Sequence, residues 1–288
     1  MTLADGIALA LRGASFVAVL QAAGIAMFLW LYRHQLQPAL RPVAALGALS
    51  NAAGLGLSLA QQLTEPARLA GSLLGVWDPS LQTMLLTSDA GKATGLRLLG
   101  LSLLLLSNTS ARRVPSAAAP VGAGLIAISF AAMGHTATDE QRWLLAPLLV
   151  AHVAVVAFWF GALLPLRITV ATEVPAIAGR VVAQFSHLAT LLVPSILLAG
   201  LIIAALLLPD LASVTTPFGR LLLIKVAGFA ALMALAAANK WRFAPRIETG
   251  DAHAATVLRR SLVAEWLIIV AVIGVTTLLT GLFSPGHG

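Results

Sequence analysis

Long runs of apolar residues constrain the fold of this chain more than any other feature of its sequence. A helix needs about 20 apolar residues to cross a hydrocarbon core of about 30 Å. Only 10% of the residues are charged and 59% are hydrophobic, whereas a soluble domain carries about 25% charged residues. The sequence therefore predicts an all-α polytopic membrane protein in which residues 1–288 form a single integral membrane domain.

Eight apolar runs are expected to form transmembrane helices joined by short loops. They lie at about residues 7–32, 42–63, 92–107, 120–133, 143–166, 181–208, 219–239 and 261–283. Between the second and third runs, Trp77 and a mixture of charges favour a segment that lies in the membrane interface.

The basic residues are distributed unevenly among the loops. Arg33 and Arg41 lie between the first and second spans, and Arg112 and Arg113 lie between the third and fourth, with no acidic residue in either loop. The loops after the fifth and seventh spans are also rich in basic residues. Because cytoplasmic loops carry an excess of lysine and arginine, both termini are expected to be periplasmic in a bacterial inner (cytoplasmic) membrane. These loops account for the net charge of +7, so nucleic-acid binding is not expected.

Two short patterns suggest an internal repeat. Each has a hydroxyl residue, a glycine three positions later and a cation six positions after that: Ser88-x-x-Gly91 with Arg97, and Thr216-x-x-Gly219 with Lys225. Gly24 and Gly161 also occupy similar places in the first and fifth spans. The patterns predict a parallel repeat of the kind found in transporters, over residues 1–133 and 134–288. Coincidence in an apolar chain is the alternative.

Two histidines are predicted to lie inside the membrane, where polar groups are costly and indicate function. His152 is about ten residues into the fifth span from the outside, and His187 is about seven residues into the sixth span from the inside. These spans are adjacent in the sequence and antiparallel, so the two imidazoles are expected within reach of one another if they face the same seam. The alternative is that each donates to a neighbouring carbonyl and has only a structural role.

A second group of candidate ligands lies at the outer ends of helices. Met133 and His135 are two positions apart at the end of the fourth span, and Met84 lies before the third. Cu(I) prefers sulfur and imidazole ligands, and the chain has no cysteine. This group predicts a copper entry site. Otherwise Met133 fills the helix and His135 is an exposed cap.

Three further charged residues lie near the ends of predicted spans. Arg97 and Lys225 are expected to extend their long side chains toward the membrane surface. Glu265 is expected to pair with Arg259, Arg260 or a neighbouring helix. The sequence contains no nucleotide-binding loop and no HExxH or GxSxG motif, so the chain is not expected to be an enzyme or to be driven by bound ATP.

Several sequence strings, in their order and spacing, resemble the copper resistance protein D (CopD) family. These are GHTA at 134–137, FWFGALLPL at 158–166, QFSHLA at 184–189, TPFGRLLLIK at 216–225, AAANKWRFAP ending at 245 and VLRRSLVAEW at 257–266. In the first half, SDAGKATGLR follows the family's pattern of a small residue, a glycine and an arginine. The resemblance covers most of the chain and is strongest from Gly134 onward.

The resemblance implies an eight-helix inner-membrane protein that moves copper from the periplasm to the cytoplasm. The candidate ligands that it carries over are His135 and His152, while His187 follows a shared Phe-Ser pair. Members of the family often work beside a periplasmic copper-binding protein of the CopC type or are fused to one. A separate partner of that type is therefore expected here, besides the lipid bilayer and the copper ion.

Two other functions fit the same residues. His152 and His187 on adjacent helices could ligate a b-type haem in a membrane redox protein. A membrane copper sensor, or an assembly partner for a periplasmic copper chaperone, would bind copper at the outer face without moving it across the membrane.

Overall fold

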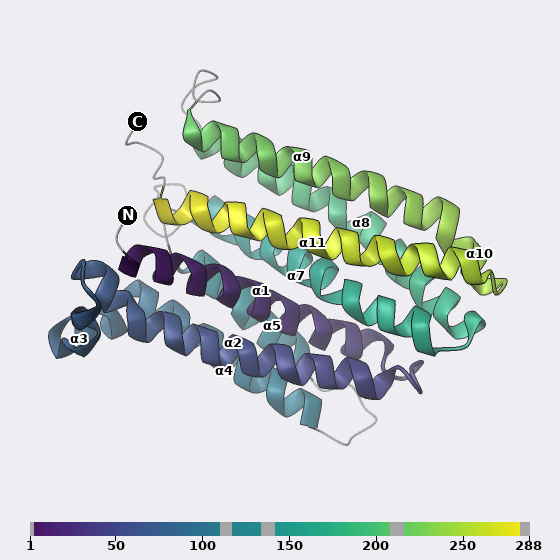
Figure 1. Cartoon of the computed structure of the whole chain (residues 1–288), viewed down its shortest axis with the longest axis horizontal. Coiled ribbons are helices and arrows are strands. Elements are labelled where there is room, and N and C mark those ends of the chain that lie inside the picture. Colours follow the sequence, from purple (N-terminus) through teal and green to yellow (C-terminus); the bar gives the residue numbers. More distant parts are fainter. Residues whose placement is uncertain (1–2, 110–116, 134–141, 208–215, 283–288) are drawn as a thin grey trace.

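The computed structural model describes residues 3–109, 117–133, 142–207 and 216–282, and all regular structure within these ranges is helical (Figure 1). The longer helices are α1 (Leu3–Tyr32), α2 (Leu40–Leu69), α4 (Asp89–Thr109), α5 (Ala118–Ala131), α7 (Arg142–Thr172), α8 (Pro175–Leu207), α9 (Pro217–Ala238) and α11 (Ala252–Leu282). The shorter ones are the 3-10 helix η1 (Leu73–Trp77), α3 (Pro79–Thr87), the π-helix η3 (Asn239–Phe243) and α10 (Ala244–Glu248).

Seven of the described helices are long and apolar enough to cross a membrane. They coincide with seven of the eight predicted spans, and the chain is therefore a multi-pass membrane protein. The remaining predicted span, at about 120–133, corresponds to α5, which has 14 residues. At 1.5 Å per residue α5 is about 21 Å long, shorter than the hydrocarbon core.

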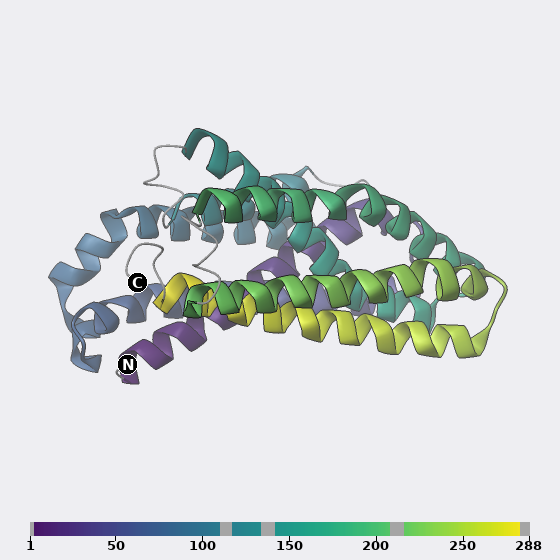
Figure 2. The ribbon, with the colours of Figure 1, turned by 90° about the horizontal axis from the view of Figure 1, so that it is seen from above.

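The long helices run side by side as one bundle, with α1 at its centre. Figure 1 places the start of α1 and the end of α11 at the same end of the bundle. Helix α1 packs against α2, α5, α7 and α11, and α9 packs mainly against α11. Figure 2 shows α9 beside α11, with α8 in a separate row. Which end of the bundle faces the periplasm remains a prediction from the loop charges.

Glycines allow two helix pairs to approach until their backbones touch. A Cβ atom added to Gly24 of α1 would lie 1.9 Å from the carbonyl oxygen of Ala157, and one added to Gly161 of α7 would lie 2.4 Å from the Cα of Gly24. Likewise, a Cβ on Gly100 of α4 would lie 2.7 Å from the carbonyl oxygen of Gly122 in α5. Small residues at such crossings are typical of membrane helices. The two glycines predicted to be equivalent therefore meet where α1 crosses α7.

The two repeated sequence patterns form the same local structure. The backbone N–H of Gly91 donates to Oγ of Ser88 over 3.4 Å, and the N–H of Gly219 donates to Oγ1 of Thr216 over 3.2 Å. Each hydroxyl thus satisfies an orphan N–H in the first turn of a helix, α4 or α9. The larger repeat over 1–133 and 134–288 remains a prediction.

One buried carboxylate joins the end of α7 to the start of α2. Oε1 of Glu173 accepts the backbone N–H groups of Gln37 at 2.8 Å and Ala39 at 3.0 Å. Both residues lie just before α2, so Glu173 satisfies backbone donors that no helical hydrogen bond would satisfy.

Candidate functional site

His152 lies on α7 with its imidazole turned toward α8. Its Cε1 atom is 3.9 Å from the position that a Cβ would take on Gly200, so the missing side chain leaves room for the ring. Its Nδ1 atom is buried and has no partner at hydrogen-bonding geometry, although the backbone of Ile196 is close. Lys225 of α9 is near enough for its charge to act on the imidazole. His152 is therefore a half-buried ring whose Nδ1 atom is buried and unpartnered, inside a transmembrane helix.

His187 lies on α8 in a different environment. Its side chain is exposed, and it precedes Gly200, the neighbour of His152, by thirteen residues. Thirteen residues of α-helix span about 20 Å. The structure therefore does not bring His152 and His187 together, although their helices pack against each other.

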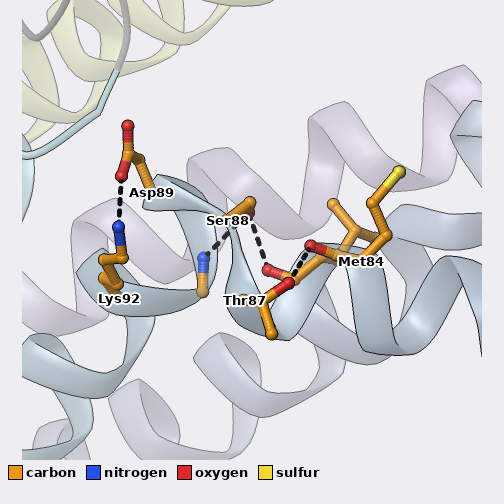
Figure 3. Close-up of polar contacts among 7 residues, drawn as sticks. Met84, Thr87, Ser88, Asp89 and Lys92 are labelled. Carbon is orange, nitrogen blue, oxygen red and sulfur yellow. Dashed lines mark hydrogen bonds and ion pairs between the residues drawn. The ribbon is translucent and has the colours of Figure 1, made fainter.

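The predicted outer group is only partly described. Met133 follows α5 and is half-buried, whereas His135 lies outside the described residues. Met84 is 52% exposed on α3. Figure 3 shows its thioether extending away from the turn in which Ser88 caps α4 and Lys92 pairs with Asp89. A copper entry site formed by Met133 and His135 remains a prediction.

Arg97 departs from the prediction that it extends to the membrane surface. Its side chain is only 2% exposed. The guanidinium carbon lies 4.9 Å from the ring centroid of Phe130 and 5.6 Å from that of Phe16, and Nε donates to Oγ of Ser129 over 3.3 Å. Two aromatic faces and one hydroxyl surround the cation inside the bundle, so its side chain does not extend to the membrane surface.

Glu265 pairs with neighbouring helices, which is one of its predicted alternatives. Within the described residues no ion pair joins it to Arg259 or Arg260. The carboxylate instead accepts the side-chain amide of Asn239 and the indole of Trp159. Glu265 is 2% exposed and Asn239 is 8% exposed. The side chain points into the bundle because Glu265 lies on the face of α11 that packs against α7 and the π-helix.

Beside Glu265 is a cavity of about 350 Å³. Residues of α7, α8, α9, η3 and α11 surround it, and most of its walls are aliphatic or aromatic. Its polar lining consists of the side chains of Ser186, Thr190, Asn239, Lys240 and Glu265. Nζ of Lys240 donates to Oγ1 of Thr190 over 2.7 Å. The ammonium is thus held on the α8 side of the cavity.

Sequence reasoning missed Asn239. The residue begins the π-helix η3, and single π-turns inside helices often occur at functional sites. The available signal was a lone polar residue after the apolar run 226–238. The direction of the Asn239 side chain depends on the extra residue in the π-turn, and the apolar pattern does not predict that turn.

No described group of three or more histidine, aspartate or glutamate side chains is arranged to hold a metal ion.

Family comparisons cover both halves of the bundle. Residues 3–143 match the model of the copper resistance protein D-like N-terminal domain, and residues 179–279 match the model of copper resistance protein D. The first match includes α1 to α5, and the second includes most of α8 together with α9 and most of α11. No curated protein and no solved structure matches the chain.

Proposed function

Because the chain belongs to the copper resistance protein D family, we propose that it moves copper ions across the bacterial inner membrane from the periplasm to the cytoplasm. The observation that carries the proposal is His152, a half-buried transmembrane imidazole whose Nδ1 atom is buried and unpartnered. Imidazole nitrogen binds both common oxidation states of copper. An intramembrane ionisable residue of this kind marks an ion path more often than a structural contact.

In the proposed path, Met133 and His135 capture copper at the outer face and pass it to His152. Lys225 lies close to His152, and its positive charge weakens the hold of the imidazole on a cation. A weakened site releases its ion more readily. His187 is exposed on α8 and has no necessary place in this path.

A separate periplasmic protein of the CopC type is proposed to deliver the ion at the outer face. The chain itself carries out no reaction in this scheme. The separation of His152 from His187 does not favour a b-type haem, because both axial imidazoles of a bis-histidine haem must bind one iron atom.

Copper uptake into vesicles reconstituted with the purified protein tests the proposal. His152→Ala is expected to lower the initial rate about tenfold, the lower end of the effects seen when groups supporting a metal site are lost. His253→Ala is the matched control, because His253 is exposed near the start of α11.

Uptake by the unaltered protein no faster than in protein-free vesicles would overturn the proposal. Copper bound at the outer face without uptake would point to a sensor or an assembly partner instead. Equal rates for His152→Ala and the unaltered protein would remove His152 from the path.

A further inference from the structure

The cavity beside Glu265 contains two acceptor groups that lack a cation. The buried carboxylate of Glu265 accepts only neutral donors among the described residues, from Asn239 and Trp159. An uncompensated charge inside a protein in the membrane is costly. The nearby ammonium of Lys240 is engaged by Thr190 and forms no described ion pair with Glu265. A positively charged occupant of the cavity would compensate the carboxylate.

The amide oxygen of Asn239 independently points to the same kind of occupant. Asn239 is 8% exposed, lines the cavity, and its Oδ1 is buried without a hydrogen-bond donor. Its Nδ2 is used by Glu265. A buried acceptor without a donor is rare and calls for an explanation. A cation in the cavity would satisfy Oδ1 and the carboxylate together.

Met233 adds a soft ligand to this set. It belongs to α9, lies six residues before Asn239, and lines the same cavity. Thioether sulfur prefers Cu(I), whereas carboxylate and amide oxygens suit harder ions. A mixed set of this kind holds copper less tightly than a uniform set of soft ligands would. It suits a place that copper passes through.

The position of the cavity connects it with His152. Trp159, whose indole donates to Glu265, follows His152 on α7 by seven residues. Seven residues are about two turns and about 10 Å of helix, so the two side chains project from the same face. On α8, Val193 and Pro194 line the cavity three and two residues before Ile196, which lies beside His152. The cavity therefore begins within about two helical turns of His152.

We propose that Met233, Asn239 and Glu265 form a second copper site, through which the ion passes after leaving His152. This inference rests on the proposed function, since it takes copper as the transported ion. Glu265 supplies the charge, Met233 the soft ligand and Asn239 the free amide oxygen. Lys240 and Thr190 lie at the exposed side of the cavity, where the ion would leave.

The double variant Met233→Leu with Glu265→Gln tests this site in two assays. The first is copper uptake into reconstituted vesicles. The second is equilibrium binding of Ag(I), a redox-inert soft ion, followed by quenching of tryptophan fluorescence, because Trp159 and Trp241 line the cavity. We expect uptake about tenfold slower and Ag(I) affinity about tenfold weaker in the double variant.

The matched control is the double variant Met27→Leu with Glu248→Gln. It makes the same two chemical changes at a half-buried methionine of α1 and an exposed glutamate of α10, neither of which lines the cavity. Two further variants test the site in case the double variant does not fold. Met233→Leu alone leaves the contacts of Glu265 in place, and Ala236→Phe fills the cavity from α9. Both are expected to slow uptake while gel filtration shows a single folded species.

The outcomes separate this inference from the proposed function. If the unaltered protein takes up copper and the double variant matches it in both assays, the second site is wrong and the transport function stands. If the unaltered protein takes up no copper, the transport function fails, and Ag(I) binding still decides the site. Ag(I) binding that is weaker in the double variant but not in its matched control would then support the site. Ag(I) binding equal to that of the unaltered protein would overturn it.

Discussion

The two halves of the bundle enclose a buried charged side chain in opposite ways. In the first half, Phe16, Phe130 and Ser129 surround the guanidinium of Arg97. In the second half, the carboxylate of Glu265 has two neutral donors on one side and a cavity on the other. Aromatic rings and a hydroxyl enclose the first charge, whereas the second borders a cavity. The difference indicates a structural role for Arg97 and a functional one for Glu265.

Helix packing explains the space beside Glu265 in the second half. Helices α4 and α5 meet at Gly100 and Gly122, where their backbones are in contact, so the first half closes around its aromatic side chains. In the second half, α9 packs mainly on α11 and stands apart from α8 (Figure 2). The cavity lies between these helices.

The largest expected effect on stability comes from a substitution that forces α1 and α7 apart where the two halves touch. Gly24→Val would place a branched side chain against the backbone of Ala157, where even a Cβ comes within 1.9 Å of the carbonyl oxygen. Overpacking typically costs about 1–3 kcal/mol, and a clash between backbones offers no rotamer to relieve it. We expect destabilisation at or above about 3 kcal/mol, measured as lost monodisperse protein and a lower Tm in detergent.

Gly124→Ala is the control for this change. A Cβ on Gly124 meets no atom within 4 Å, and alanine is favoured over glycine in a helix by about 1 kcal/mol. The variant is expected to be as stable as the unaltered protein or slightly more so. A stable Gly24→Val protein would mean that the two halves can shift apart. The contact between α1 and α7 would then not fix their relative positions.

A second prediction contrasts Arg97 and Glu265 directly. Arg97→Ala removes a buried side chain from between two rings and leaves a hole, so we expect a loss of about 2–4 kcal/mol in stability. Copper uptake per folded molecule is expected to stay unchanged. Glu265→Gln keeps the size and shape of the side chain, so the stability of the protein is expected to change by less than about 1.5 kcal/mol. Copper uptake is expected to fall.

Thermal unfolding and vesicle uptake of both variants, measured on the same preparations, check this contrast. The reverse pattern, with uptake lost in Arg97→Ala and stability lost in Glu265→Gln, would exchange the roles assigned to the two halves.

The sequence predicts the helices better than their ends or their rotation. Seven apolar runs are confirmed as long helices, because the hydrocarbon core requires runs of that length. The helices extend beyond the apolar runs: α11 begins at Ala252 instead of about 261 and α8 at Pro175 instead of about 181. Polar residues outside the hydrocarbon continue a helix as long as its hydrogen bonds and caps are satisfied.

The site could be predicted only where a single residue carries the signal. His152 stands out as a histidine in an apolar run, and the structure gives it a half-buried ring whose Nδ1 atom is buried and unpartnered. The environment of Glu265 could not be predicted, because it depends on the rotation of α11 and on the π-turn that orients Asn239. For Arg97, the sequence does not show that two distant phenylalanines enclose the cation.

The smallest expected effect concerns two aspartates outside the membrane, one in each half. Asp251 accepts the backbone N–H groups of Ala254 and His253, and these hydrogen bonds hold its pKa below the ordinary value. Asp78 accepts from the hydroxyl of Ser80 and from backbone N–H groups, which lower its pKa in the same way. Each carboxylate caps a helix, α11 or α3.

Because the folded-state pKa is depressed, the charged carboxylate stabilises its cap above the ordinary value of about 3.9. That stabilisation is lost as the pH falls through the folded-state pKa. We expect the N–H groups of His253 and Ala254 to exchange faster with deuterium in acid, after correction for intrinsic rates. Asp251→Asn keeps an oxygen acceptor and should abolish this pH dependence.

Asp78→Asn makes the same change in the other half, where α3 has only nine residues. Acid is expected to open the whole of α3 but only the first turn of α11, because the 31 residues of α11 continue into the packed bundle. Equal acid opening of α11 in the unaltered protein and in Asp251→Asn would show that this carboxylate does not fix the start of the helix that carries Glu265.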